Sequence, residues 1–480
     1  MSVDADEKTR GLLRAALARG RAGAAPRLMR EHCLAPERRP GGIVVQRLML
    51  APEAHEGDEH AVPVVLVHSD DARGDGARPL ICFMHGTGGD SEGLLETHLV
   101  PFAKRGYCAL GVDAPCHGRR LDPAPEAKIP PPEAKSPSSS RTPDDADGLA
   151  ASLRAPSGHV SLSRSRSETF ERYGAALVAA WRGGSEPPER SAAERSAADS
   201  SPIRHSGHSG SARPFLFDGA WDCLRAVRFA TGLSNRDGRT TVGDPKGPDA
   251  APPTRAASGN EPPLDLVDVN VDATRVGVSG VSLGGMYAWL AAAAAPETIA
   301  AAAPLIGAQD FGWALRNERW RARVDSLPPA LFRAAERDER ETLGDERTSP
   351  REVSPELVER VYDAICPGLT TFLDGPRTFP LVAPRPMLIV NGELDPRNPL
   401  EGVRGLVAAT RRAYESKKKT KNFVAVAQRG VAHACTPQML ALADAWLDWR
   451  LRPAAAFCDG NRAEAAVAEA LRDAETWLEL

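Results

Sequence analysis

The chain has 480 residues, 42% of them hydrophobic, and a formal net charge of −4. This length suits one large α/β domain with insertions, or two domains. The small net charge gives no field that would favour a nucleic acid or an anionic membrane as partner. The eight cysteines include no C-x-x-C pair, so neither a disulfide framework nor a zinc site is expected.

The N-terminal region does not have the pattern of a secretory signal, because it is acidic at Asp4 and Asp6 and never builds an apolar core. Residues 9–30 are rich in Arg and Ala, as transit peptides are, but the early acids and the scarcity of serine argue against one. No stretch is apolar enough to span a membrane. We therefore expect a soluble cytoplasmic protein, with an organelle such as the plastid as the alternative.

Residues 1–40 form a predicted N-terminal helical extension. Within it, an amphipathic helix is expected over 8–32, with Leu12, Leu13, Ala16 and Leu28 on one side. Beyond it, strand and helix patterns alternate, which favours a doubly wound, mostly parallel, eight-stranded sheet. Strands are predicted over 43–50, 62–68, 80–84, 107–112, 275–281, 299–306, 386–390 and 423–427, and helices over 94–104, 168–181, 218–231, 402–416 and 437–451 and from 286 onwards.

Three stretches rich in Pro, Ser, Gly and charge interrupt this alternation and are expected to be disordered, solvent-exposed insertions. They cover about 121–167, 183–213 and 234–262. A helical stretch over about 309–374 is expected to form a lid. The resulting α/β domain covers 41–452, and a C-terminal helical extension, with a helix over 461–479, covers 453–480.

The chemistry of the chain centres on Gly280-Val-Ser-Leu-Gly284, which joins a strand pattern to an Ala-rich helix pattern. A G-x-S-x-G sequence in a strand–turn–helix context places its serine on a strained turn at the carboxyl end of the sheet. Glycines at 280 and 284 leave room for this turn. The pattern therefore predicts that Ser282 is a nucleophile.

A serine nucleophile needs a base, and the base needs a carboxylate that orients it. Asp395 follows a late strand and His433 follows the last one, so both are expected at the same sheet edge as Ser282. Glu393 and Asp310 compete with Asp395, and Asp310 is the reserve choice. No metal and no organic cofactor are expected.

The other histidines are weaker candidates for the base. His85 and His117 lie in glycine turns and are expected to be structural, while His205 and His208 lie in a Ser/Gly tract with no expected role.

The oxyanion of an acyl-transfer intermediate needs hydrogen-bond donors. The backbone N–H of Leu283 is one candidate, and the N–H of Thr87, in the loop His85–Gly89, is the other. A phosphate-binding role for this loop is excluded, because it contains neither a Walker lysine nor G-x-G-x-x-G.

The stretches FMHGTGG, DAPCHGRR, FDGAWDCLRAVRF, GVSGVSLGGMYAWLAAAA, LIGAQDFGWA, PRPMLIVNGELDPRNP and GVAHACTPQM resemble plant-type α/β-hydrolases. These are similar to the acetyl-xylan-esterase, dienelactone-hydrolase and prolyl-oligopeptidase-like branch. The resemblance covers about residues 40–452 without the insertions, and it implies Ser282, Asp395 and His433 as the triad. One departure is Val431-Ala432 before His433, where such proteins often have a glycine.

About forty residues precede the first predicted strand, too few for the β-propeller of the oligopeptidases in that branch. We therefore expect an esterase of small substrates that acts through an acyl-enzyme. An acyltransferase, a small-peptide or thioester hydrolase, and an idle hydrolase fold that only binds a ligand remain alternatives. The pocket is expected to include His85 and Gly86. A helix is expected over 311–324, with Trp313 and Trp320 on one face. These two side chains would either line the pocket or pack on the core.

Overall fold

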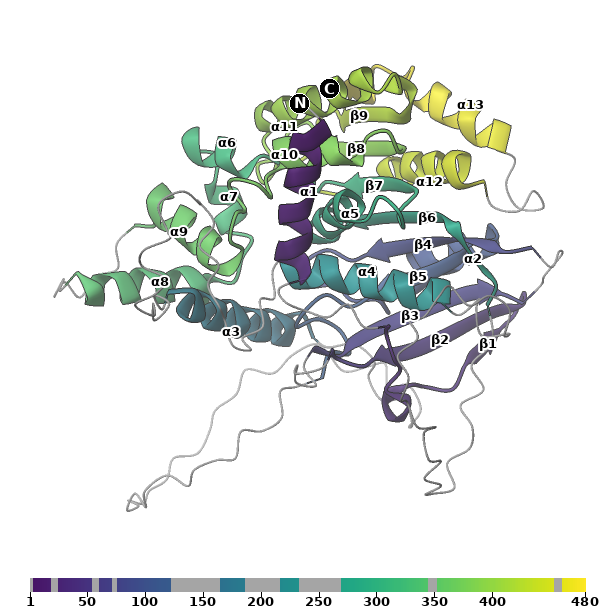
Figure 1. Cartoon of the computed structure of the whole chain (residues 1–480), viewed down its shortest axis with the longest axis horizontal. Coiled ribbons are helices and arrows are strands. Elements are labelled where there is room, and N and C mark those ends of the chain that lie inside the picture. Colours follow the sequence, from purple (N-terminus) through teal and green to yellow (C-terminus); the bar gives the residue numbers. More distant parts are fainter. Residues whose placement is uncertain are drawn as a thin grey trace, which may run out of the picture.

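The computed structural model describes residues 3–18, 25–53, 60–70, 76–121, 165–185, 216–232, 269–343, 352–452 and 460–480 (Figure 1). Apart from a few residues at their edges, the three predicted insertions lie outside the described residues, and so do His205 and His208. No helix in the described part is both long and apolar enough to cross a membrane.

Ten strands form one sheet in the order β1-β2-β3-β5-β4-β6-β7-β8-β9-β10. The strands are β1 (Glu37–Arg39), β2 (Ile43–Leu50), β3 (Val62–Ser69), β4 (Arg78–Met84), β5 (Cys108–Val112), β6 (Val271–Val281), β7 (Ala301–Leu305), β8 (Met387–Gly392), β9 (Phe423–Gln428) and β10 (Trp477–Glu479).

The six strands from β5 across to β9 are parallel, and β3 runs antiparallel to its neighbours β2 and β5. The sheet is mainly a covered, parallel one, and this explains why its strands are continuous apolar runs rather than alternating patterns. The eight predicted strands are confirmed. The two extra strands are three-residue edge strands, too short to give a sequence pattern, so the expected count of eight was wrong.

Helices cover both faces of the sheet. They are α1 (Val3–Ala18), η1 (Arg30–His32), η3 (Leu95–Leu99), α2 (Val100–Lys104), α3 (Arg166–Ser185), α4 (Leu216–Gly232), α5 (Leu283–Ala294), α6 (Phe311–Arg316), α7 (Arg321–Val324), α8 (Pro329–Thr342), α9 (Pro355–Ile365), α10 (Gly375–Thr378), η6 (Phe379–Val382), α11 (Leu400–Ser416), η7 (Thr420–Asn422), α12 (Pro437–Leu451) and α13 (Gly460–Ala470).

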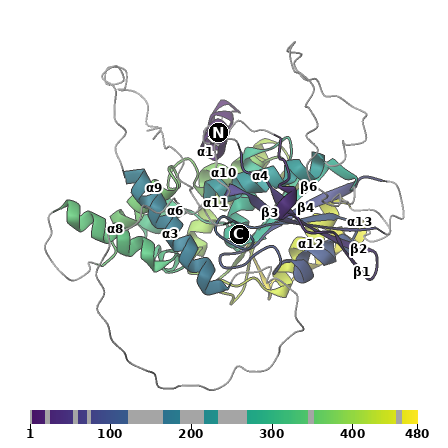
Figure 2. The same ribbon diagram turned by 90° about the horizontal axis from the view of Figure 1, so that it is seen from below.

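The buried apolar side chains form two clusters, one on each face of the sheet. Helices α1, α4, α5 and α11 contribute to one cluster. Helices α2, α12 and α13 contribute to the other. Helices α3, α6, α8 and α9 gather beside the sheet rather than on a face of it (Figures 1 and 2).

The N-terminal helix differs from the prediction. It spans Val3–Ala18 and buries Leu13 and Leu17 in the main core, whereas Leu28 lies in extended chain and bridges Leu50. Two arginines of α1 reach the C-terminal end of α5, where Arg10 Nε donates to Ala293 O (3.2 Å) and Arg14 Nε donates to Ala294 O (2.7 Å).

Two other predicted helices are also corrected. The C-terminal one spans only Gly460–Ala470, and the chain then returns to the sheet as β10. The expected helix over 311–324 is two short helices, because α6 ends at Arg316 and Glu318 adopts a positive φ of 57°. Trp313 and Trp320 therefore do not share a helix face.

The chain changes direction between the adjacent strands β4 and β6. It continues from β4 to β5 on one side and then crosses to β6 on the other. Ligands of open α/β sheets bind beyond the carboxyl ends of the strands at such a switch point. The loops after β4 and β6 are the ones that carry Thr87 and Ser282.

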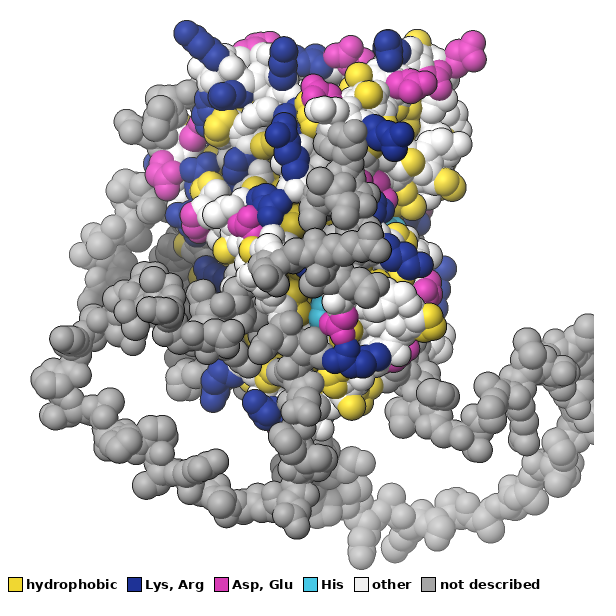
Figure 3. Space-filling view, turned by 90° about the vertical axis from the view of Figure 1, so that its right-hand side faces the viewer, with side chains coloured by type: hydrophobic (Ala, Val, Ile, Leu, Met, Phe, Trp, Pro, Cys, Tyr) yellow, Lys and Arg dark blue, Asp and Glu magenta, His cyan; other side chains and the backbone are white. Residues whose placement is uncertain are grey.

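On the face remote from α8 and α9, basic and acidic side chains are interspersed (Figure 3).

Candidate active site

Ser282 stands on a strained turn between β6 and α5. Its φ of 56° and ψ of −111° belong to a region that non-glycine residues seldom adopt. The two flanking glycines are required by close backbone contacts. A Cβ at Gly280 would lie 2.6 Å from Met84 O, and one at Gly284 would lie 2.1 Å from the same oxygen. The expected reason for both glycines is confirmed.

Ser282, His433 and Asp395 form one chain of hydrogen bonds. The distance from Ser282 Oγ to His433 Nε2 is 2.8 Å, and that from His433 Nδ1 to Asp395 Oδ2 is 2.7 Å. A carboxylate can only accept, so Nδ1 carries the proton and Nε2 is free to accept the serine proton. The hydroxyl thus faces the atom that can deprotonate it.

The pKa values of this pair suit a neutral base and an ionised acid. Burial lowers the pKa of His433, and the nearby cations Arg323 and Arg397 lower it further, against the opposing effect of Asp395. Burial alone would raise the pKa of Asp395. The hydrogen bonds from His433 and from the N–H groups of Arg397 and Asn398 outweigh burial, so the pKa lies below its ordinary value.

Asn398 is a site residue that the sequence analysis missed. Its Nδ2 donates to Asp395 Oδ2 (2.9 Å) and to Ile306 O (2.8 Å), and its Oδ1 accepts from Arg323 Nη2 (2.5 Å). Ile306 has a φ of 42°, an outlier for a β-branched residue. The only sequence signal was an Asn three residues after the candidate acid, in a Pro-rich turn.

The two competing acids lie elsewhere. Asp310 caps α6 by accepting from Trp313 N (2.7 Å). Glu393 accepts from Gly430 N (2.9 Å) and faces Arg429. Among the described residues, neither of these two acids hydrogen-bonds His433, whereas Asp395 does.

The loop His85–Gly89 lies against the turn that carries Ser282. A Cβ built on Gly86 would be 3.2 Å from Val281 O and 3.7 Å from Ser282 Cβ. Among the described residues, no acceptor is found for the backbone N–H of Thr87 or of Leu283. The two predicted oxyanion donors therefore belong to segments that lie next to Ser282, and their role remains a prediction.

Two histidines hold this loop in place. His85 hydrogen-bonds Gly86 O through Nδ1 (2.8 Å) and accepts from Ala114 N at Nε2 (2.9 Å). His117 bonds Pro115 O through Nδ1 (2.7 Å) and accepts from Gly88 N at Nε2 (3.1 Å). Burial lowers the pKa of His117 to about 3, so its ring stays neutral. Both rings have structural contacts, and His85 has no ring nitrogen left for a substrate.

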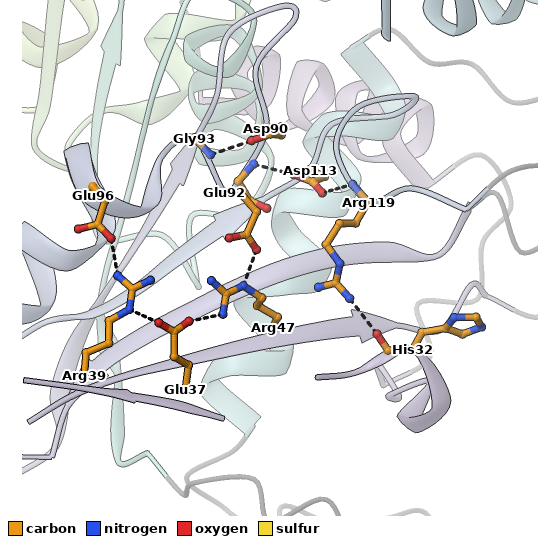
Figure 4. Close-up of polar contacts among 11 residues, drawn as sticks. His32, Glu37, Arg39, Arg47, Asp90, Glu92, Gly93, Glu96, Asp113 and Arg119 are labelled. Carbon is orange, nitrogen blue, oxygen red and sulfur yellow. Dashed lines mark hydrogen bonds and ion pairs between the residues drawn. The ribbon is translucent and has the colours of Figure 1, made fainter. Parts of the chain in front are cut away.

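A polar network continues from the same loop to the N-terminal strands (Figure 4). Asp113 accepts from the backbone N–H of Ser91 (2.7 Å) and of Arg119 (2.8 Å). Arg47 joins Glu92 to Glu37, each at 2.7 Å. Backbone N–H groups and ion pairs thus fix the segment that follows the Thr87 loop.

The tryptophans expected near the pocket pack on protein. Trp313 lies against Gly402, where an added Cβ would meet its ring at 2.8 Å. Trp320 is only 5% exposed, and the Arg321 guanidinium lies 5.0 Å from its ring centre. In the described part of the chain, no group of three or more His, Cys, Asp or Glu side chains is arranged to hold a metal ion.

The strand order from β2 to β9, the single reversed strand β3 and the serine turn after β6 together define the architecture. The fold is that of the α/β-hydrolases. No protein-family model and no curated protein matches the sequence.

Solved structures that are similar to this chain include several esterases. The acetyl xylan esterase from Paenibacillus sp. R4 is 14% identical, with a TM-score of 0.44 over 93% of this chain and 94% of that one. Acetyl xylan esterase 1 from Thermoanaerobacterium sp. JW/SL YS485 is 11% identical, with a TM-score of 0.43 over 95% and 99%. The methylesterase BT1017 is 12% identical, with a TM-score of 0.45 over 96% and 66%.

Proposed function

We propose that this α/β-hydrolase-fold chain is a serine hydrolase that cleaves a carboxylic ester of a small substrate. The observation that carries the proposal is the hydrogen-bond chain Ser282–His433–Asp395, with its serine on the strained turn after β6. A serine hydroxyl 2.8 Å from a neutral imidazole is a nucleophile with its base in place.

In the proposed reaction, Ser282 Oγ attacks the ester carbonyl while His433 Nε2 takes its proton. The N–H groups of Leu283 and Thr87 stabilise the oxyanion. His433 then protonates the departing alcohol, which leaves an acyl group on Ser282. Water attacks this acyl-enzyme with His433 again as the base, and the acid is released. Asp395 stabilises the imidazolium in both halves of the reaction.

We further propose that the helices of 309–374 form a lid, and that α3 belongs to it. Phe170 of α3 comes within 2.9 Å of a Cβ built on Gly88, so α3 lies over the loop that carries Thr87. Arg323 of α7 bonds Asn398 in the loop that carries Asp395. The proposed lid thus contacts the loops that carry Thr87 and Asp395, and in this proposal it restricts the site to small substrates. The hydrolase domain over 41–452 with flanking extensions remains part of this proposal.

The test combines a fluorophosphonate probe with p-nitrophenyl esters of increasing acyl length. We expect the probe to label the wild-type chain and Ser279→Ala but not Ser282→Ala. Ser279 is a matched control, because it lies in the same strand with its hydroxyl on Ala303 O (2.7 Å). Labelling that survives in Ser282→Ala would refute the nucleophile. Labelling of Ser282 without turnover of any ester would favour an acyltransferase or another acyl substrate. A chain that is neither labelled by the probe nor active on the esters would favour a binding role.

A further inference from the structure

Arg323 of α7 is a buried cation beside the candidate triad. Its side chain reaches the loop after β8, where Nη2 donates to Asn398 Oδ1 (2.5 Å) and, at 3.4 Å, to Arg397 O. Asn398 in turn bonds Asp395. Two hydrogen-bonded side chains therefore separate the guanidinium from His433.

The carboxylate of Asp395 acts on this guanidinium only through Asn398, without a direct ion pair. The residue is 8% exposed, its Nε is buried without an acceptor, and no carboxylate of the described chain forms an ion pair with it. Burial lowers the pKa of Arg323. An unpaired buried charge is costly, so a protein that keeps one commonly uses it for a ligand or for charge balance.

Two tyrosine hydroxyls near Arg323 are also without partners. Tyr173 of α3 and Tyr362 of α9 are each 1% exposed, and neither hydroxyl has a hydrogen-bond partner in the described chain. Burial raises the pKa of both phenols, and the charge of Arg323 opposes that rise. Both hydroxyls therefore remain protonated donors in the neighbourhood of the same cation.

The placement of these groups relates them to the serine. Tyr173 packs edge-on against His117, at 5.4 Å between ring centres, and His117 holds the N–H of Gly88 next to Thr87. Arg323 approaches from the other side, through the loop of Asp395. Helices α3 and α7, which carry Tyr173 and Arg323, thus contact the loops of Gly88 and Asp395.

We propose that Arg323, with the hydroxyls of Tyr173 and Tyr362, forms a subsite for a carboxylate, so that the preferred substrate is an ester that bears a second, free carboxylate. The inference rests on the proposed esterase function and deepens it. Arg is suited to this role because its planar fork binds a carboxylate through more than one N–H. The substrate anion would accept from the unused Nε–H of Arg323 and from the two phenols, and would add a directly bonded counter-charge to the more distant one of Asp395.

The competing explanation is that Arg323 only positions Asp395 through Asn398. The two explanations predict different effects of an Arg323 substitution on the turnover of neutral and acidic esters. A residue that only positions Asp395 affects every substrate alike, whereas a residue that also binds the substrate carboxylate causes a further loss on substrates that carry the anion. Neutral and acidic esters of matched shape therefore separate them.

The experiment compares kcat and KM for two pairs of esters. Monomethyl adipate against methyl hexanoate places the carboxylate on the acyl side, and 4-acetoxybenzoate against phenyl acetate places it on the alcohol side. We expect the wild-type chain to prefer the acidic member of at least one pair. In Arg323→Gln, kcat/KM for that acidic ester should fall about ten- to hundredfold, mainly through KM, because a charge-assisted hydrogen bond is lost. Turnover of the neutral ester should also change, because Arg323 bonds Asn398 and lowers the pKa of His433. The measure of the subsite is therefore the further loss of kcat/KM on the acidic ester beyond the loss on its neutral partner.

The controls are an exposed arginine and a conservative tyrosine variant. Arg321 lies on the same helix α7 and pairs with the exposed Glu352. Arg321→Gln should therefore leave kcat/KM for both esters unchanged. Tyr362→Phe keeps the ring and should weaken only the acidic ester, which provides a test if Arg323→Gln does not fold. An equal loss on both members of a pair, or no preference for either acidic ester, would overturn the subsite.

A binding measurement keeps this test separate from the proposed function. Adipate should bind Ser282→Ala in a calorimetric titration, and the added change Arg323→Gln should abolish that binding. If no ester is turned over but adipate binds through Arg323, the esterase proposal fails and the subsite stands. If esters are turned over but adipate binding is the same with and without Arg323, the subsite fails and the esterase stands.

Discussion

Replacing Asp395 by Asn tests the orientation of His433 in a way that the structure makes specific. Oδ1 of Asp395 accepts from the N–H of Arg397 (2.8 Å) and of Asn398 (3.1 Å). Oδ2 accepts from His433 Nδ1 (2.7 Å) and from Asn398 Nδ2 (2.9 Å). An amide has one oxygen and one NH2 group, so it can satisfy only one of these two sides.

The backbone side decides which way the amide turns. If its oxygen faces His433, two backbone donors lose their acceptor, at about 1–3 kcal/mol each. If its oxygen faces the backbone, only Asn398 Nδ2 loses its acceptor, because His433 can move its proton to Nε2 and accept at Nδ1. The second arrangement is favoured by one unmade bond, about 1–3 kcal/mol. It leaves Nε2 protonated and unable to accept the proton of Ser282.

We therefore expect Asp395→Asn to lower kcat about 10⁴-fold, which is on the order of 5 kcal/mol, from the wrong tautomer and the lost stabilisation of the imidazolium. The assay is steady-state hydrolysis of a p-nitrophenyl ester, with Ser282→Ala as the background. Nitrogen NMR of the imidazole should show the proton on Nε2. Asp310→Asn, which alters only the cap of α6, and Glu393→Gln should each retain kcat within about tenfold. Retention of activity by Asp395→Asn, or an equal loss in Asp310→Asn, would refute this reasoning.

Three further outcomes are expected. The kcat/KM for a neutral ester should rise with pH through a midpoint below the ordinary histidine pKa and stay level above it, since burial lowers the pKa of His433 and only the neutral base acts. Arg397→Gln should move this midpoint upward, and a downward move would contradict the electrostatics. His117→Ala should cost about 2–4 kcal/mol in urea unfolding and lower kcat far less than His433→Ala does. Gly284→Ala should destabilise the fold by about 3 kcal/mol or more, because the added Cβ would meet Met84 O. Gly405→Ala is the control, because there is open space around Gly405, and it should be neutral or stabilising. Equal effects of the two substitutions on stability would exclude a steric cause.

The sequence predicted those parts of the fold that depend on strong local patterns. Continuous apolar runs such as 80–84 and 423–427 are strands because a covered parallel sheet requires apolar side chains on both faces. The hydrogen-bonded residues Ser282, His433 and Asp395 could be placed at one edge because each follows a parallel strand. Their catalytic roles remain predictions.

What the sequence could not predict depends on contacts between distant segments. The edge strands β1 and β10 are three residues long and pair only because β2 and β9 offer free edges. The break after α6 depends on a single positive φ at Glu318, a residue type that gives no turn signal. Asn398 and Arg323 meet across 75 residues, and no local pattern marks such a pair.

The arginines of α1 have a consequence for any shortened form of the chain. Arg10 and Arg14 bond the last carbonyls of α5, and Arg385 Nη2 bonds Ala292 O in the same turn (2.6 Å). The helix that begins directly after Ser282 is thus anchored at its far end by the first turns of the polypeptide. A chain that started at residue 25 would expose two of these carbonyls and the cavity left by Leu13 and Leu17. Low activity in such a form would report a loosened α5 helix, so removal of α1 is not a neutral change for this fold.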